Sequence, residues 1–142
     1  FENLHIASLL HDIGKIGIPE AILNKNGPLT DEERKKINEH SLVGAMILGP
    51  IKDLDEAILG VKYHHERFDG KGYPEGLRSH QIPMIAAVIS VADAFDAMTT
   101  DRPYRKALTK EQAVVELERN SGTQFHPAIV RAAVALYRRG EL

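Results

Sequence analysis

The chain has 142 residues, the size of one ordinary domain, and 43% of them are hydrophobic, which is enough to form a core. Lys and Arg number 18 against 20 Asp and Glu, and the formal charge of −2 gives no general attraction to nucleic acid polymers or anionic membranes. The absence of cysteine excludes disulfides and thiolate metal sites, so any metal would need His, Asp or Glu. No apolar run reaches the roughly 18 residues of a membrane span and no signal peptide is visible, so we expect a cytoplasmic location.

The first apolar stretch has the spacing of a helix. Leu4, Ala7, Leu10 and Ile13 recur at helical intervals, and Gly14 ends the run. Residues 19–23 then predict a short helical turn that begins at a proline. The chain therefore starts with helical structure.

Three pairs of residues have the spacing of a helix N-terminal capping box. They are Thr30 with Glu33, Asp53 with Glu56, and Thr109 with Gln112. The helices that they begin are predicted to end near Leu48, His65 and Asn120. Such boxes mark where helices start, because side chains satisfy the first backbone N–H groups.

Two prolines mark the start of the remaining predicted helices. Pro83 precedes the most apolar run of the chain, residues 84–100, and Pro127 begins a last helix that ends near Gly140. Strand alternation is nearly absent. The sequence therefore predicts an all-α fold, a helical bundle that forms one domain over residues 1–142.

Histidine and aspartate recur at or inside apolar helical stretches in four separate segments. They are His11 with Asp12, His40, His64 with His65, and Asp93. A helical bundle can gather such side chains in its core, and imidazoles and carboxylates are the ligands of two-metal hydrolytic sites. Asp12 could bridge two ions there. The sequence therefore predicts a His/Asp metal centre.

Each of these residues also has a structural interpretation. His11 could be stabilised by the helix dipole, and Asp93 could form a buried ion pair with Arg102 or Lys106. Neighbours on a helix point about 100° apart, so we expect that His64 and His65 cannot chelate one metal together. They would serve two metals, or one metal and the substrate.

The other histidines and several cations complete the set of candidates. We assign structural roles to His5, His80 and His126, the last as a residue that flanks a helix start. Three cations that suit phosphate binding lie close in sequence to the proposed centre: Lys15, Arg102 and Arg105.

Taken in order, these motifs resemble the HD-GYP family, a group within the HD-domain metal-dependent phosphohydrolases. The matching strings are LLHDIGKIGIPEAILNK, the pair EH at 39–40, HHERFDGKGYPEGL, IPMIAAVISVADAFDAMTTDRPYRKAL and GTQFHP. The resemblance implies an HD-type helical bundle and a phosphodiesterase that hydrolyses the bacterial second messenger cyclic di-GMP to pGpG, often followed by cleavage to GMP. It also implies two or three divalent metal ions, with iron or manganese expected.

The resemblance also implies roles for individual residues. The metal ligands would be His11, Asp12, His40, His64, His65 and Asp93. Lys15 would act in catalysis beside Asp12, and the substrate would contact Tyr73, Arg102 and Arg105. The loop around Tyr73 is implicated in contacts with GGDEF-domain proteins, and a homodimer is one further assembly that we consider.

The chain departs from the family pattern at its start. A metal-binding His normally lies about thirty residues before the HD pair, but only ten residues precede His11. We therefore expect an N-terminally truncated HD-GYP domain. The alternative function is a catalytically silent module that binds cyclic di-GMP or GGDEF proteins, and a third is hydrolysis of another nucleotide. In a smaller departure, His126 stands where the family more often has Asp.

Overall fold

The computed structural model of the protein describes residues 1–101 and 106–142, and its regular elements over these ranges are all helical. In chain order they are α1 (Glu2–Leu10), η1 (Ile13–Gly17), α2 (Glu20–Leu23), α3 (Asp31–Asn38), α4 (His40–Leu48), α5 (Asp55–Tyr63), η2 (Ser79–Gln81), α6 (Met84–Thr99), α7 (Lys110–Arg119) and α8 (Pro127–Arg138). Over the same ranges, β pairing is limited to isolated bridges between Asp69 and Arg78 and between Ser121 and Phe125. The all-α prediction is confirmed. None of the described helices is long and apolar enough to cross a membrane.

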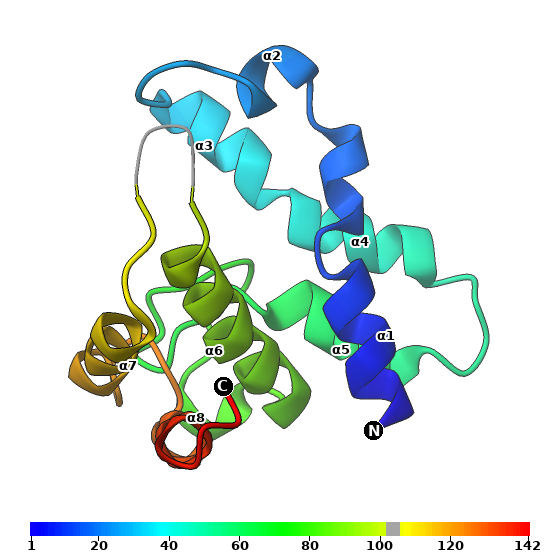
Figure 1. The fold of residues 1–142 in the computed structure, drawn as a ribbon. Coiled ribbons are helices and arrows are strands. Elements are labelled where there is room, and N and C mark those ends of the chain that lie inside the picture. The colour runs from blue at the N-terminus through cyan, green and yellow to red at the C-terminus, as the bar shows by residue number, and fades with distance from the viewer. Residues whose placement is uncertain (102–105) are drawn as a thin grey trace.

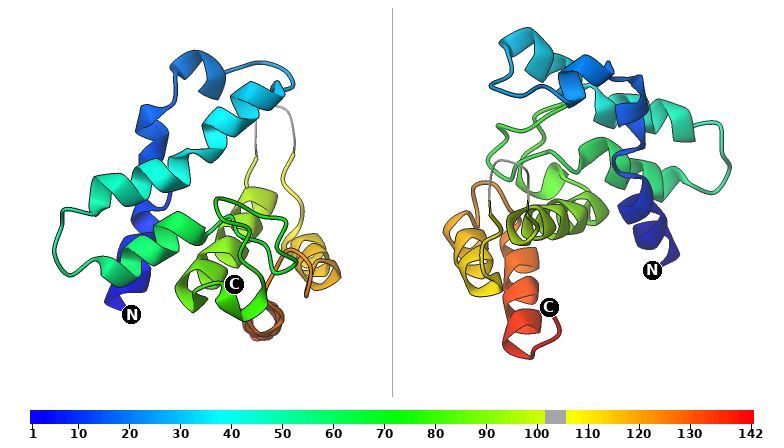
Figure 2. Two further views of the ribbon diagram at one scale, coloured as in Figure 1. Left: turned by 180° about the vertical axis from the view of Figure 1, so that it is seen from behind. Right: turned by 45° about the horizontal axis from the view of Figure 1, so that its top comes forward.

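Helix α6 takes part in three hydrophobic clusters, and the two larger ones join it to the other helices (Figure 1). The first core joins it to α1, α4 and α5, and its buried members are Ala7, Leu48, Ala57, Val61 and Ile89. The second joins it to α7 and α8, and its buried members are Val91, Val114, Leu117, Phe125, Val130 and Val134. The two further views in Figure 2 show α7 and α8 on one side of α6 and α1, α4 and α5 on the other. A residue in the middle of α6 is therefore held from both sides.

Two of the three predicted capping boxes are present. The Thr30 hydroxyl accepts a hydrogen bond from the backbone N–H of Glu33 at 3.2 Å, and the Glu33 carboxylate accepts one from the Thr30 N–H at 2.8 Å. Thr109 and Gln112 form the same pair of bonds at the start of α7. These two helix starts confirm the sequence prediction.

Two other predicted boundaries are wrong. The Asp53–Glu56 box does not form, because Asp53 has a φ of 65° in the turn and α5 begins after Leu54. The single helix predicted over residues 30–48 is divided into α3 and α4 at Glu39. The division separates a helix with no buried residue from one that buries His40, Ser41, Gly44 and Leu48.

The segment after α1 lies directly against the backbone of α4. Helix α1 ends at Leu10, and the 3-10 helix η1 follows, where the sequence spacing had predicted a continuous helix to Ile13. A Cβ added at Gly14 would overlap the carbonyl of His40 and the backbone nitrogen of Gly44. The absence of a side chain at Gly14 therefore lets the His-Asp segment approach the start of α4.

Candidate metal centre

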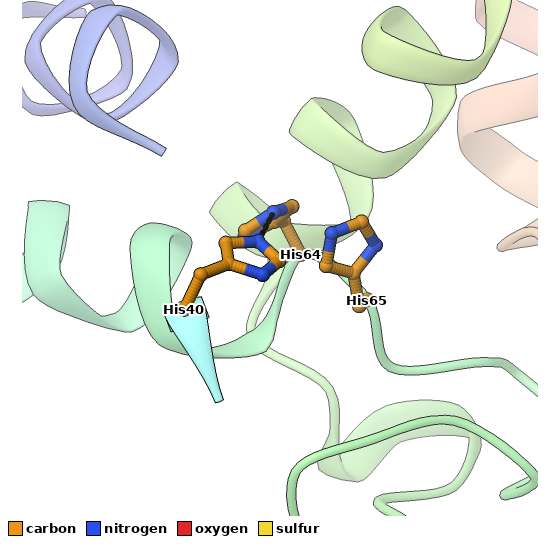
Figure 3. A group of neighbouring side chains, drawn as sticks. All are labelled: His40, His64 and His65. Atoms are coloured by element: carbon orange, nitrogen blue, oxygen red, sulfur yellow. Dashed lines mark hydrogen bonds between the residues drawn. The ribbon is translucent and has the colours of Figure 1, made fainter. Parts of the chain in front are cut away.

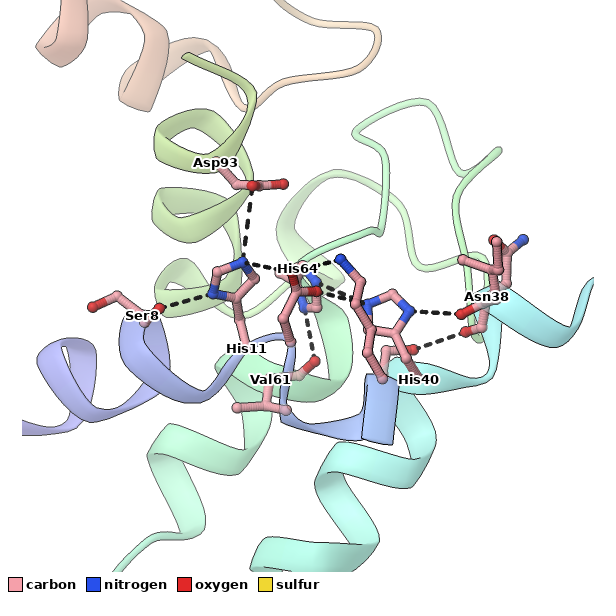
Figure 4. A network of polar contacts seen from close by, with 11 residues as sticks. Ser8, His11, Asn38, His40, Val61, His64 and Asp93 are labelled. Atoms are coloured by element: carbon pink, nitrogen blue, oxygen red, sulfur yellow. Dashed lines mark hydrogen bonds and ion pairs between the residues drawn. The ribbon is translucent and has the colours of Figure 1, made fainter. Parts of the chain in front are cut away.

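The four predicted His/Asp segments meet at one place in the fold (Figure 4). Nε2 of His11, after α1, lies 3.8 Å from Oδ1 of Asp93, in the middle of α6. Nε2 of His40, at the start of α4, lies 3.4 Å from Nε2 of His64, which directly follows α5. His65 completes the group, with its ring centroid 5.0 Å from that of His40.

Asp12 lies between two of these imidazoles. Its Oδ2 is 3.7 Å from Nε2 of His11, and its Oδ1 is 3.5 Å from Nε2 of His40. The two oxygens of one carboxylate thus face two different histidines. This is the arrangement expected of a carboxylate that bridges two cations. All six residues predicted as metal ligands are therefore close together, and Asp93 faces His11. Arg102, one alternative partner considered for Asp93, lies outside the described residues.

Three of the histidines are oriented by the backbone in the same way. Nδ1 of His11, His40 and His64 lies 2.8, 2.7 and 2.8 Å from the carbonyl oxygen three residues earlier, on Ser8, Ile37 and Val61. Because a carbonyl only accepts, each Nδ1 carries the proton and donates. Each Nε2 then presents a lone pair toward the centre of the group. Metal-ligating histidines are typically held by this kind of bond from their other nitrogen.

The pair His64 and His65 corrects one prediction. Ligand atoms of His40, His64 and His65 all lie within 4.8 Å of one another (Figure 3), so the two neighbours can face a single ion together. His64 keeps helical backbone angles (φ −64°, ψ −14°), yet the rings of His64 and His65 lie with their centroids 4.0 Å apart. Nitrogens that share an ion with bonds of about 2 Å lie within about 4 Å of each other, so the trio fits a metal after a small adjustment.

Burial keeps these imidazoles neutral. His40 and His64 are each 1% exposed, and desolvation lowers the pKa of His40 and takes that of His64 to about 4. Desolvation, with the neighbouring imidazoles His64 and His40 adding to it, lowers the pKa of His65 to about 2. Neutral imidazole is the form that binds metal. The buried histidines are therefore ready to act as ligands at neutral pH.

The opposite side of the group is open and carries charge. The side chains of Asp12, Asp93 and Lys15 are 41%, 39% and 42% exposed. Nζ of Lys15 donates to Oδ2 of Asp12 at 2.6 Å. Burial alone would raise the pKa of Asp12, but the hydrogen bond and charge of Lys15 outweigh it and the pKa is lowered. A ligand would approach the centre from this side and meet Lys15.

The loop over residues 66–78, which we call the GYP loop, forms a wall beside the histidines. The ring of Tyr73 stacks on that of His65, with centroids 4.8 Å apart and planes 29° apart. Burial and the charges of Asp12 and Asp93 raise the pKa of the Tyr73 hydroxyl, so the phenol stays protonated. Tyr73, predicted to contact substrate, therefore lies next to the proposed ligands.

The start of the GYP loop is tied to the connection between α7 and α8. The backbone N–H groups of Phe68 and Asp69 donate to the carbonyls of Gln124 and Thr123 at 3.1 and 2.8 Å. Arg67 also binds the Asp69 carboxylate, with Nη2 to Oδ2 at 2.8 Å. The GTQFHP segment, residues 122–127, thus supports the loop through its backbone.

Sequence reasoning missed Glu66, which follows the two histidines. It is 3% exposed, and its carboxylate accepts hydrogen bonds from the backbone of the GYP loop. The only signal in the sequence was an acid placed directly before a glycine-rich loop.

The remaining candidates lie apart from the centre or outside the described residues. His5 is exposed on α1. His80 and His126 surround Phe68, with ring centroids 6.5 and 5.2 Å from the phenyl ring. Nδ1 of His126 accepts from the N–H of Ala128 at 3.2 Å, which confirms its prediction as a helix-start residue. Arg102 and Arg105 belong to the segment that the structure does not describe.

A family model described as "HD domain" matches residues 1–129. The chain belongs to the HD domain family. This HD domain is 44% identical over 138 residues to a protein of Thermotoga maritima named cyclic di-GMP phosphodiesterase, a match that covers 94% of the chain and 37% of the relative. It is also 37% identical to 3′3′-cGAMP-specific phosphodiesterase 3 of Vibrio cholerae, over 87% of the chain and 27% of the relative.

A solved structure supports the fold of this HD domain. The crystal structure of a cyclic GMP-AMP specific phosphodiesterase of V. cholerae superposes with a TM-score of 0.74 at 18% identity, over 96% of this chain and 38% of that one. The resemblance to HD-GYP proteins drawn from the motifs is confirmed. The HD domain spans less than two fifths of the length of these relatives.

Proposed function

We propose that this HD domain is a metal-dependent phosphodiesterase that hydrolyses cyclic di-GMP to pGpG, with GMP as a further product. The observation that carries the proposal is the convergence of the His11 and His40 Nε2 atoms on Asp12, with the His64 Nε2 beside that of His40 and Lys15 at the open side. Support also comes from the name of the T. maritima relative, at 44% identity. We further propose that the protein acts in the bacterial cytoplasm, where this messenger is made.

In this proposal the metal ligands are His11, Asp12, His40, His64, His65 and Asp93. Their nitrogen and oxygen donors suit iron or manganese, and two or three ions are expected. When bound, such ions polarise phosphoryl oxygens and lower the pKa of water enough to give a nucleophile at neutral pH. The buried histidines stay neutral, and the two Asp12 oxygens are directed to both sides of the centre.

The other residues bind and orient the substrate. Lys15 is held at the open side by its 2.6 Å bond to Asp12, where its charge would stabilise the ribose 3′ oxygen as it departs. Tyr73, stacked on His65, would contact the nucleotide. Arg102 and Arg105 are proposed to hold the phosphates. Contacts of the GYP loop with GGDEF-domain proteins and a homodimer also remain predictions.

The test is metal analysis combined with turnover of defined substrates. The purified protein, loaded with Fe(II) or Mn(II), is incubated with cyclic di-GMP or with 3′3′-cGAMP, the substrate named for the V. cholerae relative. We expect bound metal and faster conversion of cyclic di-GMP to pGpG. Binding of cyclic di-GMP without turnover would instead favour the silent module, and preference for cGAMP would change the substrate.

A further inference from the structure

The carboxylate of Glu66 joins the metal-ligand segment to the far side of the GYP loop. Its Oε1 accepts from the backbone N–H of Glu75 at 2.7 Å, and its Oε2 accepts from that of Leu77 at 3.0 Å. Among residues 1–101 and 106–142, Glu66 is the one buried acidic residue, with 3% of its surface exposed. Burial of a carboxylate is costly unless its oxygens are bonded, and both oxygens are bonded to backbone N–H groups.

The two bonds join Glu66, which directly follows His65, to residues 75 and 77 at the far end of the loop. Between Glu66 and its two donors the chain passes through Gly72 and Tyr73. The Tyr73 N–H donates to the His65 carbonyl at 3.3 Å, so the loop returns to the residue that it left. A Cβ at Gly72 would overlap the backbone of Arg67, so the loop lies against its own beginning. These bonds bring the far part of the loop back to its start, where the Glu66 carboxylate is buried between the two.

We propose that Glu66 is a positioning residue that holds Tyr73 stacked on His65. The proposal deepens the proposed function and rests on it for the role of Tyr73 in substrate binding. Within residues 1–101 and 106–142, the Glu66 carboxylate bonds to the backbone of the GYP loop, so it acts through residues 75–77. Its position directly after His65 means that one short segment both supplies a ligand and fixes the wall beside it.

A matched control lies on the same loop. The Glu75 side chain binds Nζ of Lys62 at 2.6 Å and accepts from the Tyr63 hydroxyl at 3.2 Å, both at the surface. Glu75→Gln weakens this outer attachment while leaving the backbone N–H of residue 75 bonded to Glu66. Glu66→Gln instead keeps one acceptor oxygen and directs an NH₂ group at a second N–H donor. The two variants thus separate the inner bonds from the outer ones.

The first measurement needs no metal and no turnover. Amide hydrogen exchange and the NMR contact between the Tyr73 and His65 rings are followed in metal-free protein. We expect exchange at residues 75 and 77 to accelerate roughly 10- to 100-fold in Glu66→Gln, with loss of the ring contact and no change in α6 or α8. Glu75→Gln should leave both unchanged. Intact protection and ring contact in Glu66→Gln would overturn the proposal. Where Glu66→Gln does not fold, Glu66→Asp, which keeps both oxygens on a shorter stem, replaces it.

The second measurement is a double-mutant cycle in the metal-loaded enzyme. Glu66→Gln should raise KM for cyclic di-GMP about as much as Tyr73→Ala does, roughly tenfold, with a smaller effect on kcat. Adding Glu66→Gln to Tyr73→Ala should change KM no further, because both act through one contact. Additive effects would show that Glu66 acts elsewhere. A wild-type enzyme without turnover would refute the proposed function, and the exchange and ring-contact data would still decide the role of Glu66.

Discussion

The molecule contains two groups of histidines that use their ring nitrogens in opposite ways. In His11, His40 and His64, Nδ1 donates to a carbonyl three residues earlier, and Nε2 faces the other members of the group. In His126, Nδ1 accepts from a backbone N–H and therefore carries no proton. His126 and the exposed His80 pack against the ring of Phe68.

The difference separates the proposed ligand histidines from those with a structural role. Proximity of rings is common to both groups, since the His80 and His126 centroids are only 6.2 Å apart. The backbone partner of Nδ1 decides which nitrogen is available, and convergence of the available atoms makes a site. The following experiments test this distinction, beginning with the largest expected effect.

Replacement of His64 should remove the function of the first group. In His64→Ala, we expect Mn(II) affinity to fall by at least about 100-fold and phosphodiesterase activity to be lost, because a buried ligand is deleted. Titration calorimetry and a turnover assay measure the two effects. His80→Ala is the matched control from the second group and should leave both unchanged. Equal losses of Mn(II) affinity and activity in His64→Ala and His80→Ala would contradict the distinction between the two histidine groups.

Removal of the Lys15 charge should separate metal binding from catalysis. We expect kcat of Lys15→Met to fall about 100-fold, because the charge of Lys15 no longer stabilises the departing oxygen. Mn(II) affinity should be retained or increased, since the Asp12 carboxylate loses a competing partner at 2.6 Å. Single-turnover kinetics and calorimetry provide the readouts. A loss of metal affinity in Lys15→Met would contradict the assigned role.

The lowered pKa values of three histidines at the proposed centre predict how stability depends on pH. The pKa values of His40, His64 and His65 lie below the usual 6.5, so the unfolded chain binds more protons in mildly acidic solution. Their contribution to stability is complete above about pH 6.5 and is lost as the pH falls, down to about 4 for His64 and about 2 for His65. We expect Tm of the metal-free protein to drop by roughly 5 °C or more between pH 7.5 and 5.

A variant isolates the histidine part of this pH effect from that of the carboxylates. His64→Gln removes one buried titrating group while keeping a polar side chain of similar size, so its Tm should change less over the same pH range. Differential scanning calorimetry at several pH values makes the comparison. A pH slope that is unchanged in His64→Gln would mean that other groups govern the acid response.

The smallest effect is expected in the second group. His126→Ala removes the acceptor for the Ala128 N–H at the start of α8, which should cost about 1 kcal/mol of stability. Chemical denaturation measures this change. Mn(II) affinity and kcat should remain at their wild-type values, which would sharpen the contrast with His64. A change in Mn(II) affinity in His126→Ala would show that the second group also affects metal binding.

Much of the fold could be predicted from local patterns, because those patterns act locally. Thr30 and Thr109 start helices through bonds to residues three positions away, and the sequence contains that information. The break at Glu39 could not be predicted, because the apolar spacing continues through it and the bend depends on how α4 packs. Asp53 has the spacing of a cap, but the turn holds it in a left-handed conformation.

The candidate site shows the same limit. Residue types and their order identified the six proposed ligands, but they did not show that the His64 and His65 rings lie 4.0 Å apart and can face one ion. Glu66 could not be recognised, because its partners are backbone N–H groups nine and eleven residues away. Sequence shows which side chains carry chemistry, whereas main-chain partners appear only in three dimensions.

The contact of Gly14 with α4 has a consequence for reading mutational scans of this domain. Any side chain at Gly14 would push the His-Asp segment away from the carbonyl of His40, so every substitution there should abolish activity. Three residues later, a Cβ at Gly17 would meet only a Val43 methyl at 3.5 Å, an ordinary contact. A scan scored by activity alone would therefore rank Gly14 with the ligands, although it has no chemical group to offer. Loss of activity on substitution of Gly14 would reflect the close approach of its backbone to that of α4.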